Sequence, residues 1–270
     1  MMIVPLIITL LFHNTDSHQK FIASLYQKQD YYQCIAELRR YSMATGNDMD
    51  YSIAYCYYQG KRFTEALTVL KNKPDKETRH YLLLANIYTA LQHYTDALQT
   101  LYMCDSDRDL GLQPYLYKNI LAVHVASYDW DTALSFYNSH SDALNQMRDI
   151  FALLKQAKQE TKNPYAAAVL SAMMPGAGHA YAYHYTDGII SFVTVAILAG
   201  ATYLSYTKGK TELMYTFGTL TAIGYAGNVY SAYTSTLHSN EIINSNYRTQ
   251  IQNQFLQYSL EIFLPEWMRQ

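Results

Sequence analysis

The sequence has none of the short motifs that mark common catalytic sites. Its 270 residues contain no Gly-x-Ser-x-Gly elbow, Walker loop, His-Glu-x-x-His helix or dinucleotide-binding fingerprint. Basic clusters are also missing: the longest is Arg39-Arg40, and the formal net charge is −2, so no surface is expected to neutralise a phosphate backbone. We therefore predict that the protein is not an enzyme, uses no cofactor and does not bind nucleic acid.

Potential metal ligands are few and badly spaced. The three cysteines, Cys34, Cys56 and Cys104, lack the Cys-x-x-Cys spacing of a zinc or redox motif. His179 and His184 are five residues apart, which places them on different faces of a helix, and the sequence offers no third and fourth ligand beside them. No metal site is predicted.

Charge is scarce in the second half of the chain. Residues 163–240 contain four charged residues in 78 positions, namely Asp187, Lys208, Lys210 and Glu212, whereas the first 162 residues hold 33 of the 42. This change of composition near Asn163 favours two domains, and the poorly charged part is typical of a membrane domain.

The N-terminus is a short apolar run. Residues 1–12 have the length of the hydrophobic region of a signal peptide and are too few to span a bilayer comfortably. No Lys or Arg precedes the run and no Ala-x-Ala follows it, so the best small-residue pair for cleavage is Thr15 with Ser17. We predict that residues 1–17 are an export signal or, as the alternative, an uncleaved anchor.

A pattern of polar, aromatic, two variable, small and aliphatic residues occurs four times in the first half. The aromatic positions are 32, 31 and 36 residues apart, and they are Tyr31, Phe63, Tyr94 and Trp130. The small residues three positions after them are Cys34, Ala66, Ala97 and Ala133. Residues 18–145 therefore resemble the tetratricopeptide repeat family, whose period is about 34 residues.

The resemblance implies an all-α solenoid that binds a protein partner or a peptide. In this family fixed positions of the first helix of each repeat line the concave face, and here they are Tyr51, Tyr55, Tyr58, Arg79, Asn86, Tyr115 and Lys118. Tyrosine suits recognition because it is amphipathic and loses little rotamer entropy. The alternative is that several of these aromatic side chains only pack against a neighbouring repeat.

Two amphipathic helices are expected outside the repeats. Apolar residues recur every three to four positions over residues 142–162, where a helix would close the solenoid, and Asn163-Pro164 would stop it. A second such pattern runs from Ile243 to Ile262 within residues 241–270, and that helix would lie on the membrane or pack back on the repeats.

Between them, residues 163–240 predict a two-helix membrane domain. Residues 188–206 are 19 uncharged positions, about 28 Å of helix, and residues 213–233 form a second uncharged segment after a turn at Lys208-Gly209-Lys210. Glycines at 218, 224 and 227 would let the two helices approach closely. The alternative is a soluble all-α domain whose core helices are apolar on every face.

A helix-breaking motif opens this domain. It looks like a motif of small bacterial membrane domains of unknown function, carried here by Pro175, Gly176, Gly178, Tyr181, Asp187, Gly188, Gly227 and Asn228. The break would free backbone groups that need partners, and Asn228 and Asp187 are candidates. Asp187 is either a functional intramembrane acid or, as we favour, a cap of the next helix.

These observations predict a bacterial envelope protein that is anchored in a membrane, with its repeats in the periplasm. It would act as a scaffold that binds protein partners, in envelope protein assembly. One alternative is a small transport or proton-relay protein that uses the Pro-Gly break and Asp187. A second is a soluble α-solenoid interaction protein.

Overall fold

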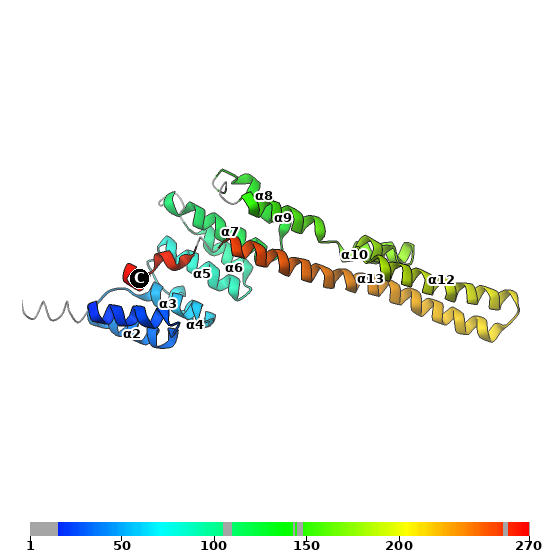
Figure 1. Cartoon of the computed structure of the whole chain (residues 1–270), viewed down its shortest axis with the longest axis horizontal. Helices are drawn as coiled ribbons and strands as arrows, with labels where there is room; N and C mark the ends of the chain where they lie inside the picture. Colours follow the sequence, from blue (N-terminus) through cyan, green and yellow to red (C-terminus); the bar gives the residue numbers. More distant parts are fainter. Residues whose placement is uncertain (1–15, 105–109, 143, 145–147, 256–258, 270) are drawn as a thin grey trace, which may run out of the picture. The chain divides into compact units, whose positions relative to one another are not determined.

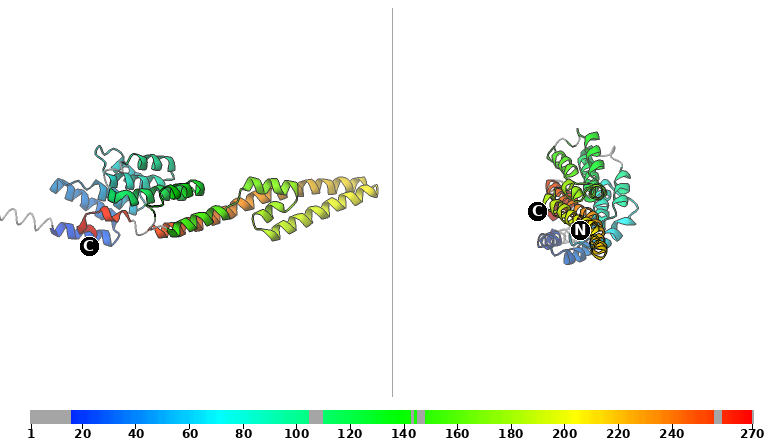
Figure 2. Two further views of the ribbon diagram at one scale, coloured as in Figure 1. Left: turned by 90° about the horizontal axis from the view of Figure 1, so that it is seen from above. Right: turned by 90° about the vertical axis from the view of Figure 1, so that its right-hand side faces the viewer.

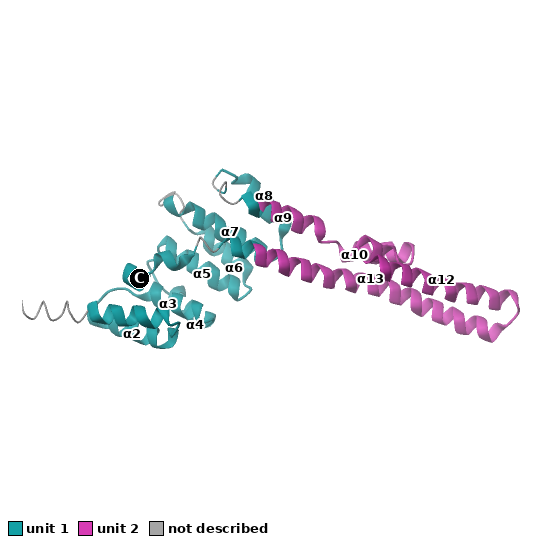
Figure 3. Cartoon of the chain, viewed as in Figure 1, with its two compact units in different colours: residues 1–150, 251–270 teal, residues 151–250 magenta. Residues whose placement is uncertain are grey.

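The computed structural model describes residues 16–104, 110–142, 144, 148–255 and 259–269. Within these ranges every regular element is a helix, so the predicted all-α fold is confirmed (Figure 1). The predicted signal peptide lies outside the described residues except for Asp16 and Ser17. The chain forms two compact units, residues 1–150 with 251–270 (unit 1) and residues 151–250 (unit 2), as Figure 3 shows.

Unit 1 is a stack of helical hairpins. Residues 16–27 are helical. The helices that follow are α2 (Tyr31–Thr45), α3 (Asp50–Gln59), α4 (Phe63–Lys71), α5 (Thr78–Ala90), α6 (Tyr94–Tyr102), η2 (Leu110–Leu112), α7 (Gln113–Ala126) and α8 (Trp130–Ser139). Neighbours in sequence pack on one another, and α5 also contacts α3 and α7. The first helices of successive repeats, α3, α5 and α7, therefore form one continuous row, the inner row.

The four aromatic residues of the repeat pattern each begin a helix, because the same turn precedes them. Two positions earlier stand Gln29, Lys61, Gln92 and Tyr128, all in the left-handed region with φ between 59° and 63°. The next residue donates its N–H to a carbonyl five positions back, as in Arg62 to Tyr57 (2.9 Å) and His93 to Tyr88 (2.9 Å). This bond satisfies a carbonyl at the end of the first helix of the pair and reverses the chain.

The small residues of the pattern lie where the two helices of a hairpin meet. Cys34, Ala66, Ala97 and Ala133 are fully buried, as are Ala54 and Ala85 on the first helices. A larger side chain at these positions would separate the helix pair. The repeat pattern in the sequence is thus the packing pattern of the solenoid.

Unit 2 contains most of α9 (Arg148–Glu160), then α10 (Pro164–Met173), α11 (Ala177–Tyr181), α12 (Tyr185–Thr207) and α13 (Thr211–Gln254) up to residue 250. The predicted stop before Pro164 is confirmed: α9 ends at Glu160, and the Asn163 side chain accepts the N–H groups of Tyr165 and Ala166 at the start of α10. Helices α12 and α13 lie side by side around a turn at Gly209, whose φ is 68° (Figure 2).

The boundary predicted after residue 240 lies inside one helix. α13 is a single helix of 44 residues, since no proline interrupts it and Gly227 is its last glycine. It ends at Gln254, so the amphipathic helix predicted to reach Ile262 stops earlier, and Tyr258 of that pattern lies outside the described residues. The chain then continues as η5 (Leu260–Phe263) and α14 (Glu266–Arg269).

Within unit 2, polar contacts join the start of the unit to α13. Asn240 accepts the N–H of Lys162 at 3.0 Å and donates to the Lys162 carbonyl at 2.7 Å. The Tyr247 hydroxyl donates to Glu160 at 2.7 Å. The chain segment between α9 and α10 is therefore held against the long helix.

Candidate functional site

The predicted partner-binding residues of α3 and α5 gather on the inner row of unit 1. Tyr51 and Tyr55 are buried and lie with their rings stacked, 6.2 Å between centroids. The Arg79 guanidinium lies 5.6 Å from the centre of the Tyr51 ring and pairs with Glu77 at 2.8 Å. Three of the seven predicted residues thus form one aromatic and cationic cluster.

The C-terminal segment of the chain fills the space in front of this cluster. Residues 259–269, which comprise η5 and α14, lie beside α3 and α5 in Figure 1. The Tyr51 hydroxyl donates to the backbone carbonyl of Leu260 at 2.8 Å. The Phe263 ring meets Tyr51 and Tyr115 edge-on, at centroid distances of 6.1 and 5.7 Å. Two of the residues predicted to bind a partner, Tyr51 and Tyr115, are therefore in contact with the chain's own C-terminal segment.

Two further contacts join this segment to the helix of residues 16–27 and to α2, and we call the surface of unit 1 that residues 259–269 cover the repeat groove. The Tyr26 hydroxyl donates to the carboxylate of Glu261 at 3.0 Å, and the Trp267 ring lies 5.6 Å from that of Tyr41. Leu260, Leu264 and Met268 are buried among the repeat helices. Residues 259–269, which lie mostly beyond the predicted amphipathic pattern, thus pack on the repeat helices.

Two groups of the groove have strongly altered acidities. Burial raises the pKa of Tyr51, whose phenol is held in the neutral form that donates to Leu260. Burial also lowers the pKa of Lys118 to about 8, and its ammonium lies 5.4 Å from the centre of the Phe255 ring. The groove is thus an apolar environment with a few directed polar atoms.

The other predicted residues of the face have structural neighbours. The Asn86 amide donates to Asn119 and to the Leu82 carbonyl, which ties α5 to α7. Tyr58 packs on Phe63 at 5.7 Å. Asn86 thus contacts the next repeat, as the packing alternative states, whereas Tyr58 and Phe63 belong to the same hairpin, α3 with α4. Tyr26 and Tyr41 were not predicted, because they do not stand at the positions that line the concave face in the tetratricopeptide family.

In unit 2 the Pro-Gly motif forms a tightly packed turn between α10 and α11, the Pro-Gly turn. Gly176 has φ 85°, and a Cβ atom built there would lie 2.0 Å from the carbonyl oxygen of Gly188. A Cβ on Gly178 would lie 1.8 Å from the carbonyl oxygen of Ala167. These positions require glycine because backbone approaches backbone directly.

The polar groups freed by the break are bonded by two side chains. Asn228 of α13 accepts the N–H of Gly176 at 3.0 Å and donates to the carbonyl of Ser171 at 3.1 Å. The Ser171 hydroxyl accepts the N–H of Gly178 at 3.1 Å. Asn228 and Ser171 are both buried, so buried side chains within unit 2 satisfy the hydrogen bonds of the backbone groups in the Pro-Gly turn.

Asp187 is not the cap of the following helix. The N-cap of α12 is His184, and Asp187 stands in the first turn with a mostly exposed side chain, 3.8 Å from Nδ1 of His184. The same pair recurs in unit 1, where His93 Nδ1 lies 3.5 Å from Asp96 at the start of α6. A carboxylate in the first turn interacts favourably with the helix dipole, so a stabilising role accounts for Asp187 without a part in any reaction.

The remaining motif residues have smaller roles. The Tyr181 hydroxyl accepts the N–H of Asn163 at 3.4 Å. A Cβ on Gly227 would meet nothing within 4 Å, so the predicted close helix approach is wrong at this position; on Gly224 it would lie 3.4 Å from Leu198. His184 bonds Ser239 at 2.6 Å. Among the described residues no group of three His, Cys, Asp or Glu is placed to hold a metal.

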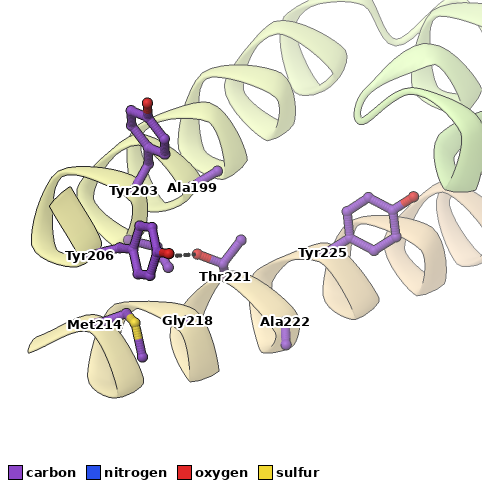
Figure 4. Close-up of a pocket in the computed structure, with 9 residues that line it drawn as sticks. Ala199, Tyr203, Tyr206, Met214, Gly218, Thr221, Ala222 and Tyr225 are labelled. Atoms are coloured by element: carbon purple, nitrogen blue, oxygen red, sulfur yellow. Dashed lines mark hydrogen bonds between the residues drawn. The ribbon is translucent and has the colours of Figure 1, made fainter. Parts of the chain in front are cut away.

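A groove of about 790 Å³ lies between α12 and α13 near their turn (Figure 4). Thr202 and Thr221 bridge its floor, with 3.1 Å between their hydroxyl oxygens. The walls are made of aromatic and small residues, among them Tyr203, Tyr206, Gly218 and Tyr225, together with Met214. The groove is a surface feature of the helical pair.

The outer surface of α12 is apolar and uncovered. Among the described residues α12 is the one helix long and apolar enough to cross a membrane, and 17% of its most apolar window is buried. Ile189, Phe192 and Ile197 are all at least half exposed. A core helix of a globular domain would have these side chains inside.

A family model matches residues 39–104, which run from the last part of α2 through α3, α4, α5 and α6. Its description is Anaphase-promoting complex, cyclosome, subunit 3, a tetratricopeptide-like family. No curated protein and no solved structure matches. The chain therefore contains tetratricopeptide-like repeats, a fold that serves protein interaction and has no catalytic role of its own.

Proposed function

We propose that the protein is a membrane-tethered scaffold in a bacterial cell envelope, whose tetratricopeptide-like repeats bind protein partners in the periplasm during envelope protein assembly. The match over residues 39–104 and the aromatic inner row of unit 1 support the scaffold. The observation that carries the tether is the exposed apolar surface of α12. At 23 residues, α12 spans about 34 Å, enough for a hydrocarbon core of about 30 Å.

The contacts of the C-terminal segment support a helix pair that crosses and returns. Residues 259–269 bond to Tyr26 and Tyr51, so the C-terminus and the repeats belong on the same side of a membrane. A single crossing by α12 would put them on opposite sides. The return falls to the first part of α13, and Lys208 and Lys210 at the turn then face the cytoplasm, where positive residues are preferred.

Alkaline phosphatase fusions test this topology. We expect activity for fusions after Lys162 and at the C-terminus, and none after Lys210, because the enzyme folds in the periplasm. Activity after Lys210 would mean that the turn is exported and the proposed orientation is reversed. Inactive fusions at all three positions would contradict export of the repeats.

Site-specific photo-crosslinking in cells tests the partner-binding face. A photo-reactive residue in place of Arg79 lies on the inner row, whereas one in place of Thr68 lies exposed on α4. We expect a crosslink to a defined envelope protein from position 79 and not from position 68. Equal crosslinking from both positions would contradict a partner site on the inner row.

A further inference from the structure

The segment 259–269 has the properties of a bound peptide. η5 and α14 have four residues each, too short to be stable as isolated helices. Their conformation depends on the repeat helices that bury Leu260, Leu264 and Met268. A segment that is ordered only by the surface it contacts is a ligand in the physical sense, here attached to its own receptor.

The groove recognises this segment by features that another chain can supply. Tyr51 bonds a backbone carbonyl, an atom of every peptide. Tyr26 bonds a carboxylate, and Tyr51 with Tyr115 holds one aromatic ring edge-on. Aliphatic side chains next to the ring and the carboxylate fill the remaining space, at the positions of Leu260 and Leu264. These contacts define a motif of aliphatic, acidic, any, aromatic and aliphatic residues.

The same groove cannot hold two peptides at once. Tyr51 and Tyr115 are inner-row positions at which the scaffold would bind its partner, and both are covered by Phe263. An attached segment competes at an effective concentration in the millimolar range, so a weak cis contact keeps the groove closed against dilute partners.

We propose that residues 259–269 are an intramolecular ligand that closes the repeat groove, and that the partner displaces them with a segment of the same chemistry: an aromatic residue followed by an aliphatic one, with a carboxylate two positions and an aliphatic residue three positions before the aromatic. This inference rests on the proposed function, because it names the ligand class and the control of the same groove. The occupant in trans is a segment of a different protein.

A synthetic peptide with the sequence of residues 256–270 tests the inference on the full chain in detergent. The variant Phe263→Ala with Trp267→Ala weakens the attached segment, because buried aromatic anchors dominate such contacts. We expect the labelled peptide to bind this variant at least tenfold more tightly than the unaltered chain. A peptide carrying the same two alanines should not bind. Equal affinity for the two chains would overturn the proposal.

Displacement can also be followed in a chain with an unaltered groove. Trp130 and Trp267 are the two tryptophans of the sequence, so in a Trp130→Phe chain the emission reports on residue 267 alone. We expect saturating peptide, made with Phe at position 267, to shift this emission to the red as the segment enters water. An unchanged emission means that the segment is a permanent part of the core and overturns the proposal, also where the double variant fails to fold.

Two outcomes separate this inference from the proposed function. If position 79 crosslinks to a partner that the peptide does not displace, the scaffold stands and the closed groove is wrong. If the peptide displaces the segment but no partner crosslinks, the groove stands and the proposed function is wrong. A dimer that forms in the double variant, seen by light scattering, would identify a second copy as the occupant and overturn the choice of a different protein.

Discussion

The hairpin turns before α6 in unit 1 and before α12 in unit 2 are built from nearly the same six residues. Residues 93–98 read HYTDAL and residues 184–189 read HYTDGI. Gln92 and Tyr183 precede them with φ of 63° and 66°, and in both turns the histidine N–H bonds a carbonyl five positions back. The same local chemistry therefore makes the same helix-turn-helix geometry in both units.

The two helices differ in what covers them. Ala97 and Gly188 are both buried against the preceding helix, but the next residue is partly buried in unit 1 (Leu98) and 65% exposed in unit 2 (Ile189). In unit 1 the following hairpin packs on α6. In unit 2 the same position faces outward, and in our proposal it faces lipid. A turn sequence thus fixes a hairpin without fixing its surroundings.

The largest expected effect comes from replacing one aliphatic residue on each of the two helices by alanine. Leu101→Ala on α6 removes a fully buried side chain and should cost about 3 to 5 kcal/mol of unfolding free energy. Ile197→Ala on α12, where Ile197 is mostly exposed, should cost less than about 0.5 kcal/mol in detergent. Denaturant titrations of the full chain measure both. Equal costs would show that protein, rather than solvent or lipid, surrounds α12.

The next largest effect on stability is expected in the Pro-Gly turn, which is found in unit 2. Gly178→Ala places a methyl group against the Ala167 carbonyl and should cost about 3 kcal/mol or more, because backbone has to move. Gly227→Ala is the control, since its Cβ enters open space, and it should be neutral or stabilising by up to about 1 kcal/mol. A tolerated alanine at position 178 would contradict the close packing of α10 on α11.

A smaller effect is a pH dependence of stability that is expected in unit 1. In the folded chain Lys118 of unit 1 has a pKa of about 8, lower than that of an exposed lysine. Between pH 8 and the ordinary pKa of lysine, the unfolded chain therefore holds more protons than the folded chain. The stability of unit 1 should therefore rise by roughly 1 to 2 kcal/mol from pH 8 to 9.5. Tryptophan fluorescence reports it, since Trp130 and Trp267 both lie in unit 1.

Lys118→Met is the control for this rise, which it should remove. Above about pH 10 the trend should reverse, because burial raises the pKa of Tyr51 and Tyr55 and the unfolded chain then loses protons that the folded chain keeps. A pH profile that is the same in the Lys118→Met chain would contradict the assignment to this lysine.

The smallest effect is expected at the acid that the two turns share. Asp187→Asn and Asp96→Asn each weaken a surface pair with the histidine three positions before, which is worth less than about 0.5 kcal/mol. Partner binding and growth should not change in either variant. Loss of function in Asp187→Asn with folding and membrane insertion intact would revive the transport or proton-relay alternative.

The repeats could be predicted from the sequence because their determinants are local. The aromatic residues at 31, 63, 94 and 130 start helices, and the small residues three positions later face the paired helix. The turn in unit 2 carries the same signal at residues 184–189, so it too is predictable from the sequence, although it lies beyond the change of composition at Asn163.

The occupant of the groove could not be predicted in this way. Tyr51 and Leu260 are 209 positions apart, and periodicity says nothing about contacts over such distances. The boundary predicted after residue 240 follows a change of composition, and α13 continues through it because no helix breaker occurs there. Asn86 was assigned to partner binding from its position in the repeat, whereas its amide bonds Asn119 of the next repeat.

Alkaline carbonate extraction of cell membranes tests the central claim, that lipid surrounds the apolar face of α12, most directly. The unaltered chain should stay in the membrane pellet, as should a Thr68→Arg control on the exposed surface of α4. Phe192→Arg with Val193→Arg, which places two charges on the uncovered face of α12, should move the protein to the supernatant, because each charge costs about 3 kcal/mol at the centre of a bilayer. Release of the unaltered chain into the supernatant would contradict the membrane tether.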